Sequence, residues 1–155
     1  MALKLPDEMK NAVNNAMADR APILMAAVQE DGQPYMSYRG STHIRGDDEF
    51  GVWLRNVEGH TASAMAKNNK VSLLYRNTET RLAFQIQGRA RIVSDEATRR
   101  AIYDGSPEVE QNADKDYKGV GMIVEIDRVI QRGQVVHARN ESEITAPAPA
   151  WASAT

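Results

Sequence analysis

The stretch from residue 33 to residue 61 constrains the fold more than any other part of the chain. It predicts two strands, over residues 34–42 and 49–55, which a Gly-Asp-Asp turn at 46–48 joins into an antiparallel pair. Directly after the second strand, Gly59, His60 and Thr61 lead into a short helix of small residues. This order places two strand ends beside the beginning of a helix.

Arginines and hydroxyl residues stand at these strand ends. Arg39 and Ser41 lie near the end of the first predicted strand, Arg55 ends the second, and Thr61 begins the helix. Guanidinium groups and the free N–H groups of a helix N-terminus both bind a dianion well, so the pattern predicts a cradle for a phosphate group. The alternative, open for each arginine, is an ordinary solvated position on a strand.

The rest of the chain alternates short apolar segments with turn residues. Helices are predicted over residues 5–20, 61–67 and 95–103, and a polar surface segment with a short helix over 108–119. Further strands are predicted over residues 23–28, 71–75, 81–93, 121–130 and 134–138, with Gly32 in a hairpin turn and Gly88 at a β-bulge. Six or seven closely spaced strands favour a mainly β antiparallel barrel with added helices.

The chain divides into one predicted domain and a tail. We expect the domain over residues 1–139 and a Pro/Ala-rich, extended or disordered tail over residues 140–155. Trp151 is the lone aromatic residue of this tail. It is therefore a candidate for docking on a partner subunit.

Composition excludes several classes of protein. The 155 residues include no cysteine, so disulfides, thiolate metal sites and cysteine nucleophiles are excluded. No signal segment or membrane-length apolar run is visible, so we expect a soluble cytoplasmic protein with no membrane partner. The net charge is −2, yet residues 39–91 carry nine lysines and arginines against five acids. A basic middle in an acidic chain fits a small anionic ligand better than a nucleic acid.

Few residues suit acid–base, nucleophilic or metal chemistry. The histidines His43, His60 and His137 lack metal-ligand spacing, so we expect no metal and expect each to be a surface or polar-site residue. The chain has no Gly-x-Ser-x-Gly nucleophile motif and no Walker-type phosphate loop. An anion cradle with so few catalytic candidates indicates that a bound cofactor carries the chemistry.

An ordered set of motifs runs through most of the chain, from about Met9 to Val136. Asp-Gly-x-Pro at 31–34 lies in a hairpin and precedes a strand ending in Arg-Gly-Ser-Thr at 39–42. Val-Trp-Leu-Arg-Asn at 52–56, Gly-His-Thr at 59–61 and a helix ending in Asn-Asn at 68–69 follow. Val-Ser-Leu-Leu-Tyr at 71–75 and Gln-Gly-Arg-Ala-Arg at 87–91 complete the set. In this order the chain resembles the flavin-binding split-barrel proteins related to pyridoxamine 5′-phosphate oxidase.

The resemblance implies a six-stranded antiparallel split β-barrel that binds FMN non-covalently at the interface of a homodimer. It also implies an oxidoreductase in which hydride passes between the flavin and a small organic substrate. The family's phosphate-binding segments, carried over to this chain, give these cofactor-binding residues: Tyr38, Arg39, Gly40, Ser41, Thr42, Trp53, Leu54, Arg55, His60 and Thr61. The expected phosphate contacts among them are Arg39, Ser41, Arg55 and Thr61. Tyr38 and Trp53 are candidates to flank the flavin, with a core position as the alternative for Trp53.

Two features separate the chain from pyridoxamine 5′-phosphate oxidase itself. That enzyme typically has Ser-Arg-Lys where this chain has Gly-His-Thr at 59–61, so Arg39 and Arg55 are expected to supply the missing positive charge. Its C-terminal Arg-Leu-His-type substrate segment is also absent here. The chain is therefore similar to shorter, broader oxidoreductase relatives, and the sequence names neither catalytic residues nor a substrate.

Other functions share this fold and stay open at this point. An F420-dependent reductase would bind a deazaflavin with a longer anionic tail. A non-catalytic flavin or haem carrier would need no substrate pocket beyond the ring. A nucleic-acid-binding barrel is disfavoured, because the basic middle has no run of exposed aromatic residues for stacking bases. The expected homodimer interface includes residues 71–76 and the Trp53 segment.

Overall fold

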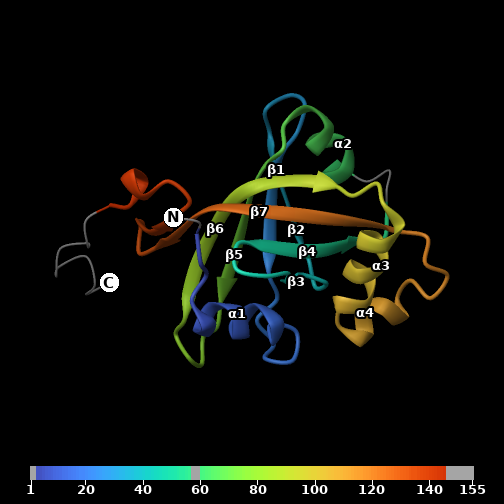
Figure 1. Ribbon diagram of the computed structural model, residues 1–155, viewed down its shortest axis with the longest axis horizontal. Helices are drawn as coiled ribbons and strands as arrows, with labels where there is room; N and C mark the ends of the chain where they lie inside the picture. Colours follow the sequence, from blue (N-terminus) through green and yellow to red (C-terminus); the bar gives the residue numbers. More distant parts are fainter. Residues whose placement is uncertain (1–2, 57–59, 146–155) are drawn as a thin grey trace.

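The computed structural model describes residues 3–56 and 60–145, and it shows a strongly curved sheet with helices at its margins (Figure 1). The strands are β1 (Leu24–Val28), β2 (Pro34–Tyr38), β3 (His43–Ile44), β4 (Glu49–Leu54), β5 (Lys70–Arg76), β6 (Ala83–Ile92), β7 (Val120–Gln131) and β8 (Gln134–Ala138). The helices are α1 (Asp7–Asn14), α2 (His60–Lys67), α3 (Glu96–Gly105), α4 (Glu108–Asn112) and the 3₁₀ turn η1 (Glu141–Glu143). Trp151, predicted to dock on a partner, lies outside the described residues.

The described strands form one antiparallel sheet in the order β2-β1-β5-β6-β7-β4-β3, with β8 paired to the last part of β7. β2 and β3 are neighbours in sequence, yet they lie at opposite edges of this order. The four residues between them span at most about 14 Å, so the sheet must curl until its two edges meet. We call this meeting place, formed by residues 39–42 and the ends of β2 and β4, the seam. The predicted mainly β split barrel with added helices is confirmed.

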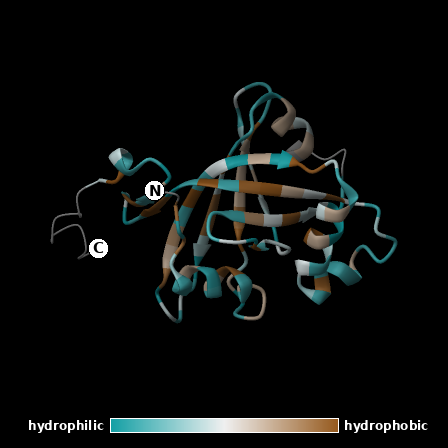
Figure 2. Cartoon of the chain, in the orientation of Figure 1, coloured by the Kyte–Doolittle hydropathy of each residue, from teal (hydrophilic) through white to brown (hydrophobic). Residues whose placement is uncertain are grey.

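The interior of the barrel is filled by alternate residues of its strands. β5 and β6 alternate buried and more exposed positions along most of their length, so one face of each strand points inward. Met25, Leu73 and Ile86 are among the fully buried side chains of this core. α1 packs its buried face against the same core, and hydrophobic residues extend over much of β7 (Figure 2).

β4 has both of its faces buried, as does the first half of its neighbour β7. Val52 and Leu54 point into the barrel core, whereas Trp53 belongs to a second apolar cluster on the opposite face. Ile102 and Tyr103 of α3 complete much of that second cluster. The C-terminal end of β4 therefore points at α3 and α4 (Figure 1), which brings these helices to the seam.

Two predicted elements are shorter than expected. The first helix ends at Asn14 instead of Arg20, and the Asn14 side chain accepts a hydrogen bond from the Ile44 N–H group at 2.9 Å. The strand predicted over residues 34–42 ends at Tyr38, and residues 39–42 turn across the seam into the two-residue β3. This division gives eight described strands, compared with the six of the predicted barrel. The predicted pairing of this strand with residues 49–55 is wrong, because β2 pairs with β1, whereas β4 pairs with β3 and β7.

Two glycines have the roles that their positions predict. Gly32 has a φ of +86° in the β1–β2 hairpin, where L-residues are strained. Gly88 lies at a register shift between β6 and β7, and a Cβ atom there would stand 2.2 Å from the Glu125 carbonyl oxygen. The predicted bulge is confirmed, and only glycine allows the two backbones to approach so closely.

Candidate functional site

A cleft of about 840 Å³ opens at the seam, between the ends of β2 and β4 and the segment that contains α4. We call it the seam cleft. Its volume is in the range of small-molecule binding sites. Seven of the ten predicted cofactor-binding residues line it: Tyr38, Arg39, Gly40, Ser41, Trp53, Leu54 and Arg55. Thr42 is buried behind the cleft, and the side chains of His60 and Thr61 lie outside the described residues.

The two arginines predicted to bind a phosphate meet in this cleft, although they follow strands that lie far apart in the sheet order. Arg39 follows β2 and is half-buried, and Arg55 follows β4 and is exposed. Burial lowers the pKa of Arg39; Tyr35 and Glu110 oppose this effect, and the positive charge of Arg55 adds to it. The fold therefore holds two like charges in one partly desolvated place. An anion bound between them would relieve both the desolvation and the repulsion.

Ser41 and Thr42 hold the seam together. The Ser41 hydroxyl donates to the Trp53 carbonyl at 3.0 Å and accepts from the Trp53 N–H group at 2.8 Å. The Thr42 hydroxyl donates to the Arg39 carbonyl at 2.8 Å. Ser41 is 1% exposed, so its hydroxyl fastens the turn to β4. The sequence predicts Ser41 as a phosphate contact, whereas in the structure its hydroxyl binds the backbone of Trp53.

The two aromatic candidates occupy different environments. Trp53 is a core residue: it stacks on Tyr117 at a centroid distance of 5.2 Å and meets the edge of Tyr103 at 5.1 Å. The guanidinium of Arg99 lies 3.9 Å from the Tyr117 ring centroid and further secures this stack. Tyr38, in contrast, is 68% exposed beside the cleft. Both residues line the cleft, but of the two only Tyr38 is exposed.

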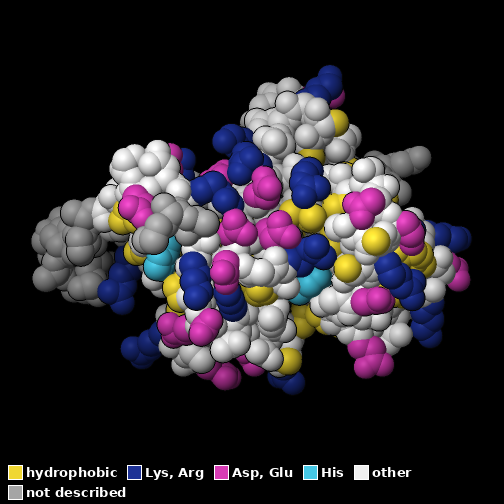
Figure 3. Space-filling model, in the orientation of Figure 1, with side chains coloured by type: hydrophobic (Ala, Val, Ile, Leu, Met, Phe, Trp, Pro, Cys, Tyr) yellow, Lys and Arg dark blue, Asp and Glu magenta, His cyan; other side chains and the backbone are white. Residues whose placement is uncertain are grey.

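Sequence reasoning missed the acidic wall of the cleft. Glu110 on α4, with Asp114 and Lys118 in the following loop, lines the side opposite the strands. Sequence reasoning treated residues 108–119 as a polar surface segment, and nothing in their pattern indicates that α3 folds them back onto β4. Acidic and basic side chains are likewise interspersed over the face of the molecule that Figure 3 draws.

Asp114 is a fixed member of this wall. It accepts hydrogen bonds from the Trp53 indole at 2.9 Å and from the Lys118 and Gly119 N–H groups at 3.0 and 2.8 Å. Burial acts to raise the pKa of Asp114, but these three donors and the charge of Arg55 lower it overall. The carboxylate stays ionised and fixes the loop to β4.

His43 is the histidine nearest the seam, and its environment corrects the expectation of a surface or polar-site residue. It is buried between Gly51 and Gly105; a Cβ atom on either glycine would lie within 2.7 Å of its Nε2. Its Nδ1 donates to the Ser41 carbonyl at 2.7 Å, since that oxygen can only accept. Burial lowers the pKa of His43, and the charge of Arg45 lowers it further. His43 is therefore a neutral packing residue behind the cleft.

Residues 3–56 and 60–145 contain neither a candidate metal centre nor a candidate membrane-spanning helix. No group of three or more histidine, aspartate and glutamate side chains is arranged there to hold a metal ion. Over the same residues, no helix combines the length and the apolar character that crossing a membrane requires.

The curled sheet, its seam and its cleft define a split-barrel protein, and comparison with known proteins identifies the family. The chain belongs to the pyridoxamine 5′-phosphate oxidase family, whose family model matches residues 6–137. No curated protein matches the sequence.

Several solved structures share the fold at low sequence identity. A pyridoxamine 5′-phosphate oxidase-related, FMN-binding protein from Nostoc punctiforme is 11% identical, with a TM-score of 0.67 over 90% of this chain and 94% of that one. HupZ from group A Streptococcus is 20% identical, with a TM-score of 0.64 over 92% and 99%. A protein related to general stress protein 26, from Clostridium acetobutylicum, is 14% identical, with a TM-score of 0.63 over 88% and 99%. At these identities the likeness shows the fold alone.

Proposed function

We propose that the protein is an FMN-binding oxidoreductase and that the seam cleft holds the phosphate end of the flavin. The observation that carries this proposal is the convergence of Arg39 and Arg55, which follow strands far apart in the sheet order, into one cleft. Two guanidinium groups match the nearly two negative charges of a phosphate monoester. Family membership and the Nostoc punctiforme protein, described as FMN-binding, support the choice of FMN.

The residues present fit this cofactor. The cleft is large enough for a substantial part of a flavin nucleotide, its cationic end lies at the ends of β2 and β4, and Tyr38 offers an exposed ring at its margin. When bound, FMN supplies hydride transfer to or from a small organic substrate. Arg39 and Arg55 would bind the phosphate, Ser41 would keep the seam turn against β4, and Tyr38 would orient the ring system.

The anchor is tested by comparing FMN with riboflavin, which has no phosphate. A charge-assisted hydrogen bond contributes about 1.5–3 kcal/mol, so Arg55→Ala should weaken FMN binding by about ten- to a hundredfold. Arg39→Ala should have an effect of the same order. Riboflavin should bind the wild type more weakly than FMN and should respond little to either substitution. Fluorescence titration of the refolded apoprotein measures all of these affinities.

Arg91→Ala is the matched control, because Arg91 is an exposed arginine near the end of β6 and outside the cleft. It should leave both flavin affinities unchanged. If FMN and riboflavin lose affinity equally in Arg55→Ala, Arg55 supports the fold and does not bind the phosphate. Unchanged FMN affinity in both cleft variants would remove the site from the seam.

Oxidoreductase activity is tested separately from binding. The absorption spectrum of freshly purified protein distinguishes FMN from the deazaflavin F420 or a haem. Bound FMN should be reduced by NADH or NADPH and reoxidised by an acceptor with repeated turnover. A tightly bound flavin that stays oxidised with every nicotinamide donor would indicate a carrier instead of an enzyme.

We further propose that the outward face of β2, β1 and β5 is a homodimer interface. Tyr38, Leu24 and Leu74 stand in register across these three strands, and Met36 lies in the next row on the same face. Tyr38, Met36 and Leu74 are 68%, 64% and 46% exposed, which is unusual for large apolar side chains on one sheet face. Tyr38 also lines the seam cleft, so a partner on this face would lie at the cleft margin. The Trp53 side chain, expected in the interface, is buried in the core.

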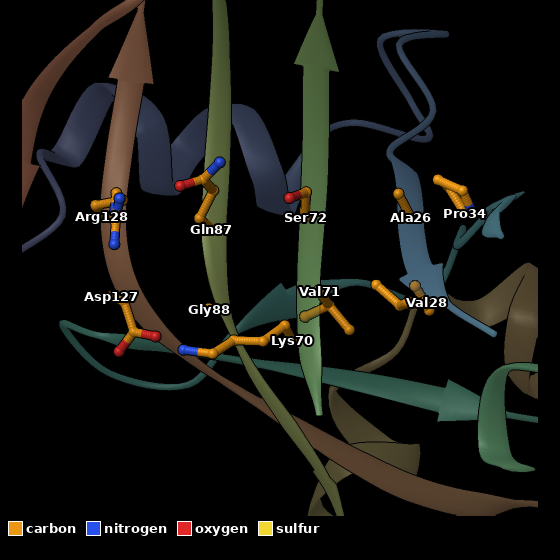
Figure 4. Close-up of a pocket in the computed structure, with 11 residues that line it drawn as sticks. Ala26, Val28, Pro34, Lys70, Val71, Ser72, Gln87, Gly88, Asp127 and Arg128 are labelled. Atoms are coloured by element: carbon orange, nitrogen blue, oxygen red, sulfur yellow. The ribbon is translucent and has the colours of Figure 1, made fainter. Parts of the chain in front are cut away.

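The same face carries a shallow hollow of about 450 Å³ that a partner could enter (Figure 4). Small side chains form its floor, among them Ala26 and Ser72, and Lys70 extends across β6 toward Asp127. Leu74→Arg should convert a dimer to a monomer in sedimentation experiments, since it would bury an unpaired charge. Ile144→Arg, at a position that is 44% exposed and outside both clefts, is the control. A wild-type monomer at micromolar concentration would contradict this assembly.

A further inference from the structure

One acidic side chain reaches into the place where the phosphate is proposed to bind. Glu110 extends from α4 across the seam cleft to Gly40. A Cβ atom added to Gly40 would stand 2.6 Å from Glu110 Oε1, and the next nearest atom would be Met17 Sδ at 3.1 Å. The carboxylate thus packs directly against the backbone of the residue that follows Arg39. A residue with any side chain at position 40 would push it away.

Charge places the same carboxylate beside the cleft cations. Burial is the main cause that lowers the pKa of Arg39, whereas the charge of Glu110 is one of the causes that raise it. Glu110 therefore stabilises the positive charge of Arg39. A bound phosphate would stabilise the same charge in the same way. The two anions would repel each other if both stayed there.

We propose that the Glu110 carboxylate acts as an internal anion that occupies the phosphate position of the seam cleft and leaves it when a phosphorylated ligand binds. This inference rests on the proposed FMN site and adds a residue that sets its affinity. Glu110 makes the cleft selective, because a ligand must present an anion strong enough to replace a carboxylate that is already in place. Neutral ligands gain nothing from that replacement.

The second acid of the cleft is not suited to this role. Asp114 is fixed by three N–H donors, from Trp53, Lys118 and Gly119. Glu110 stands on a five-residue helix whose N-cap, Pro107, provides no side-chain hydrogen bond. Its longer side chain also has more rotatable bonds than that of Asp114. The structure therefore contains one fixed acid and one that can rotate out of the cleft.

Removing the charge of Glu110 tests this role. Isothermal titration of the refolded apoprotein with FMN, riboflavin and inorganic phosphate compares the wild type with Glu110→Gln. Glu110→Gln should tighten FMN binding by about three- to tenfold, because it removes a competing charge from a partly exposed site. Phosphate should gain in the same direction, and riboflavin should be unaffected. Glu108→Gln, on the same helix but exposed and outside the cleft, should change none of the three.

The outcomes separate this inference from the proposed function. FMN binding that weakens or stays unchanged in Glu110→Gln overturns the internal-anion role, even if Arg55→Ala confirms the phosphate anchor. A gain that is equal for FMN and riboflavin also overturns it, because the effect would not involve the phosphate. If the wild type binds no flavin, the proposed function fails. A phosphate affinity that rises in Glu110→Gln would then still support the internal anion, and an unchanged one would overturn it.

Discussion

The environments of the arginines differ between two regions, the β6–β7 strand pair and the seam. Across the β6–β7 pair, Arg89 binds Asp127 through Nε and Nη2 at 3.0–3.2 Å, and hydrogen bonding to Asp127 raises the pKa of Arg89. At the seam, burial and the charge of Arg55 lower the pKa of Arg39, although Tyr35 and Glu110 oppose them. The surroundings of Arg89 favour its charged form, whereas the surroundings of Arg39 on balance disfavour it.

Under the proposed function, this difference separates the structural cation Arg89 from the proposed binding cation Arg39. An arginine whose pKa is raised by a bidentate carboxylate has its donors committed, and an incoming anion would have to break that pair. An arginine whose pKa is lowered gains stability when an anion arrives. Because nine basic residues lie within residues 39–91, charge alone does not tell the two kinds apart. The environment of each guanidinium does.

The largest expected effect concerns the residue that holds the seam, and it is a stability effect. Ser41→Ala leaves the buried N–H and C=O groups of Trp53 without the partners that they have here. Because each unsatisfied buried group costs about 1–3 kcal/mol, we expect the free energy of unfolding to fall by about 2–4 kcal/mol. Urea denaturation monitored by Trp fluorescence measures it.

Ser37→Ala is the control for this substitution. Ser37 lies on β2 and its Oγ is buried without a hydrogen-bond partner, so removing it should be neutral or slightly stabilising. If Ser41→Ala and Ser37→Ala behave alike, the seam does not depend on the Ser41 hydroxyl. The contrast between the two regions would then need another explanation.

A smaller effect distinguishes the β6–β7 pair from the seam, because a substitution in the first should lower stability and one in the second should weaken ligand binding. Asp127→Asn removes the carboxylate of Arg89, so we expect a loss of about 1–2 kcal/mol in the free energy of unfolding, moderated by partial solvent exposure. FMN affinity should not change. Arg39→Gln should do the reverse, with stability within about 0.5 kcal/mol of the wild type and clearly weaker FMN binding. Equal stability losses in the two variants, measured by urea denaturation, would break the comparison.

The smallest effect concerns His43, the buried histidine that directly follows the seam turn. Burial lowers the pKa of His43 in the folded state, so the unfolded chain takes up its proton at higher pH than the folded one. The stability that His43 contributes is therefore fully present above the ordinary pKa of about 6.5. It decreases as the pH falls below that value toward the folded-state pKa, by less than about 1.4 kcal/mol per pH unit.

His43→Asn tests this dependence, because its amide can still donate to the Ser41 carbonyl and does not titrate. Thermal unfolding of both proteins between pH 7 and pH 5.5 should show a smaller loss of stability in the variant. Equal losses would place the acid sensitivity in other groups.

Part of the site could be predicted because it depends on local sequence. Arg39 and Arg55 stand at strand ends, and strand ends follow from alternation and turn residues that lie close to them in the chain. The closure of the sheet also follows from local order, since a four-residue link between β2 and β3 cannot reach across an open sheet. The turn at Gly32 and the bulge at Gly88 could be predicted for the same reason.

The tertiary structure alone decided how each side chain at the seam is used. Whether Ser41 faces a ligand or the Trp53 backbone depends on β4, which folds over it, and not on its own neighbours. Trp53 is buried because α3 and Tyr117 pack against it. Glu110 lies opposite Arg39 only because α3 carries α4 to the seam. Burial, strand pairing and directional hydrogen bonds depend on residues far away in the chain, whereas strand ends, turns and charge depend on residues that are close together in the sequence.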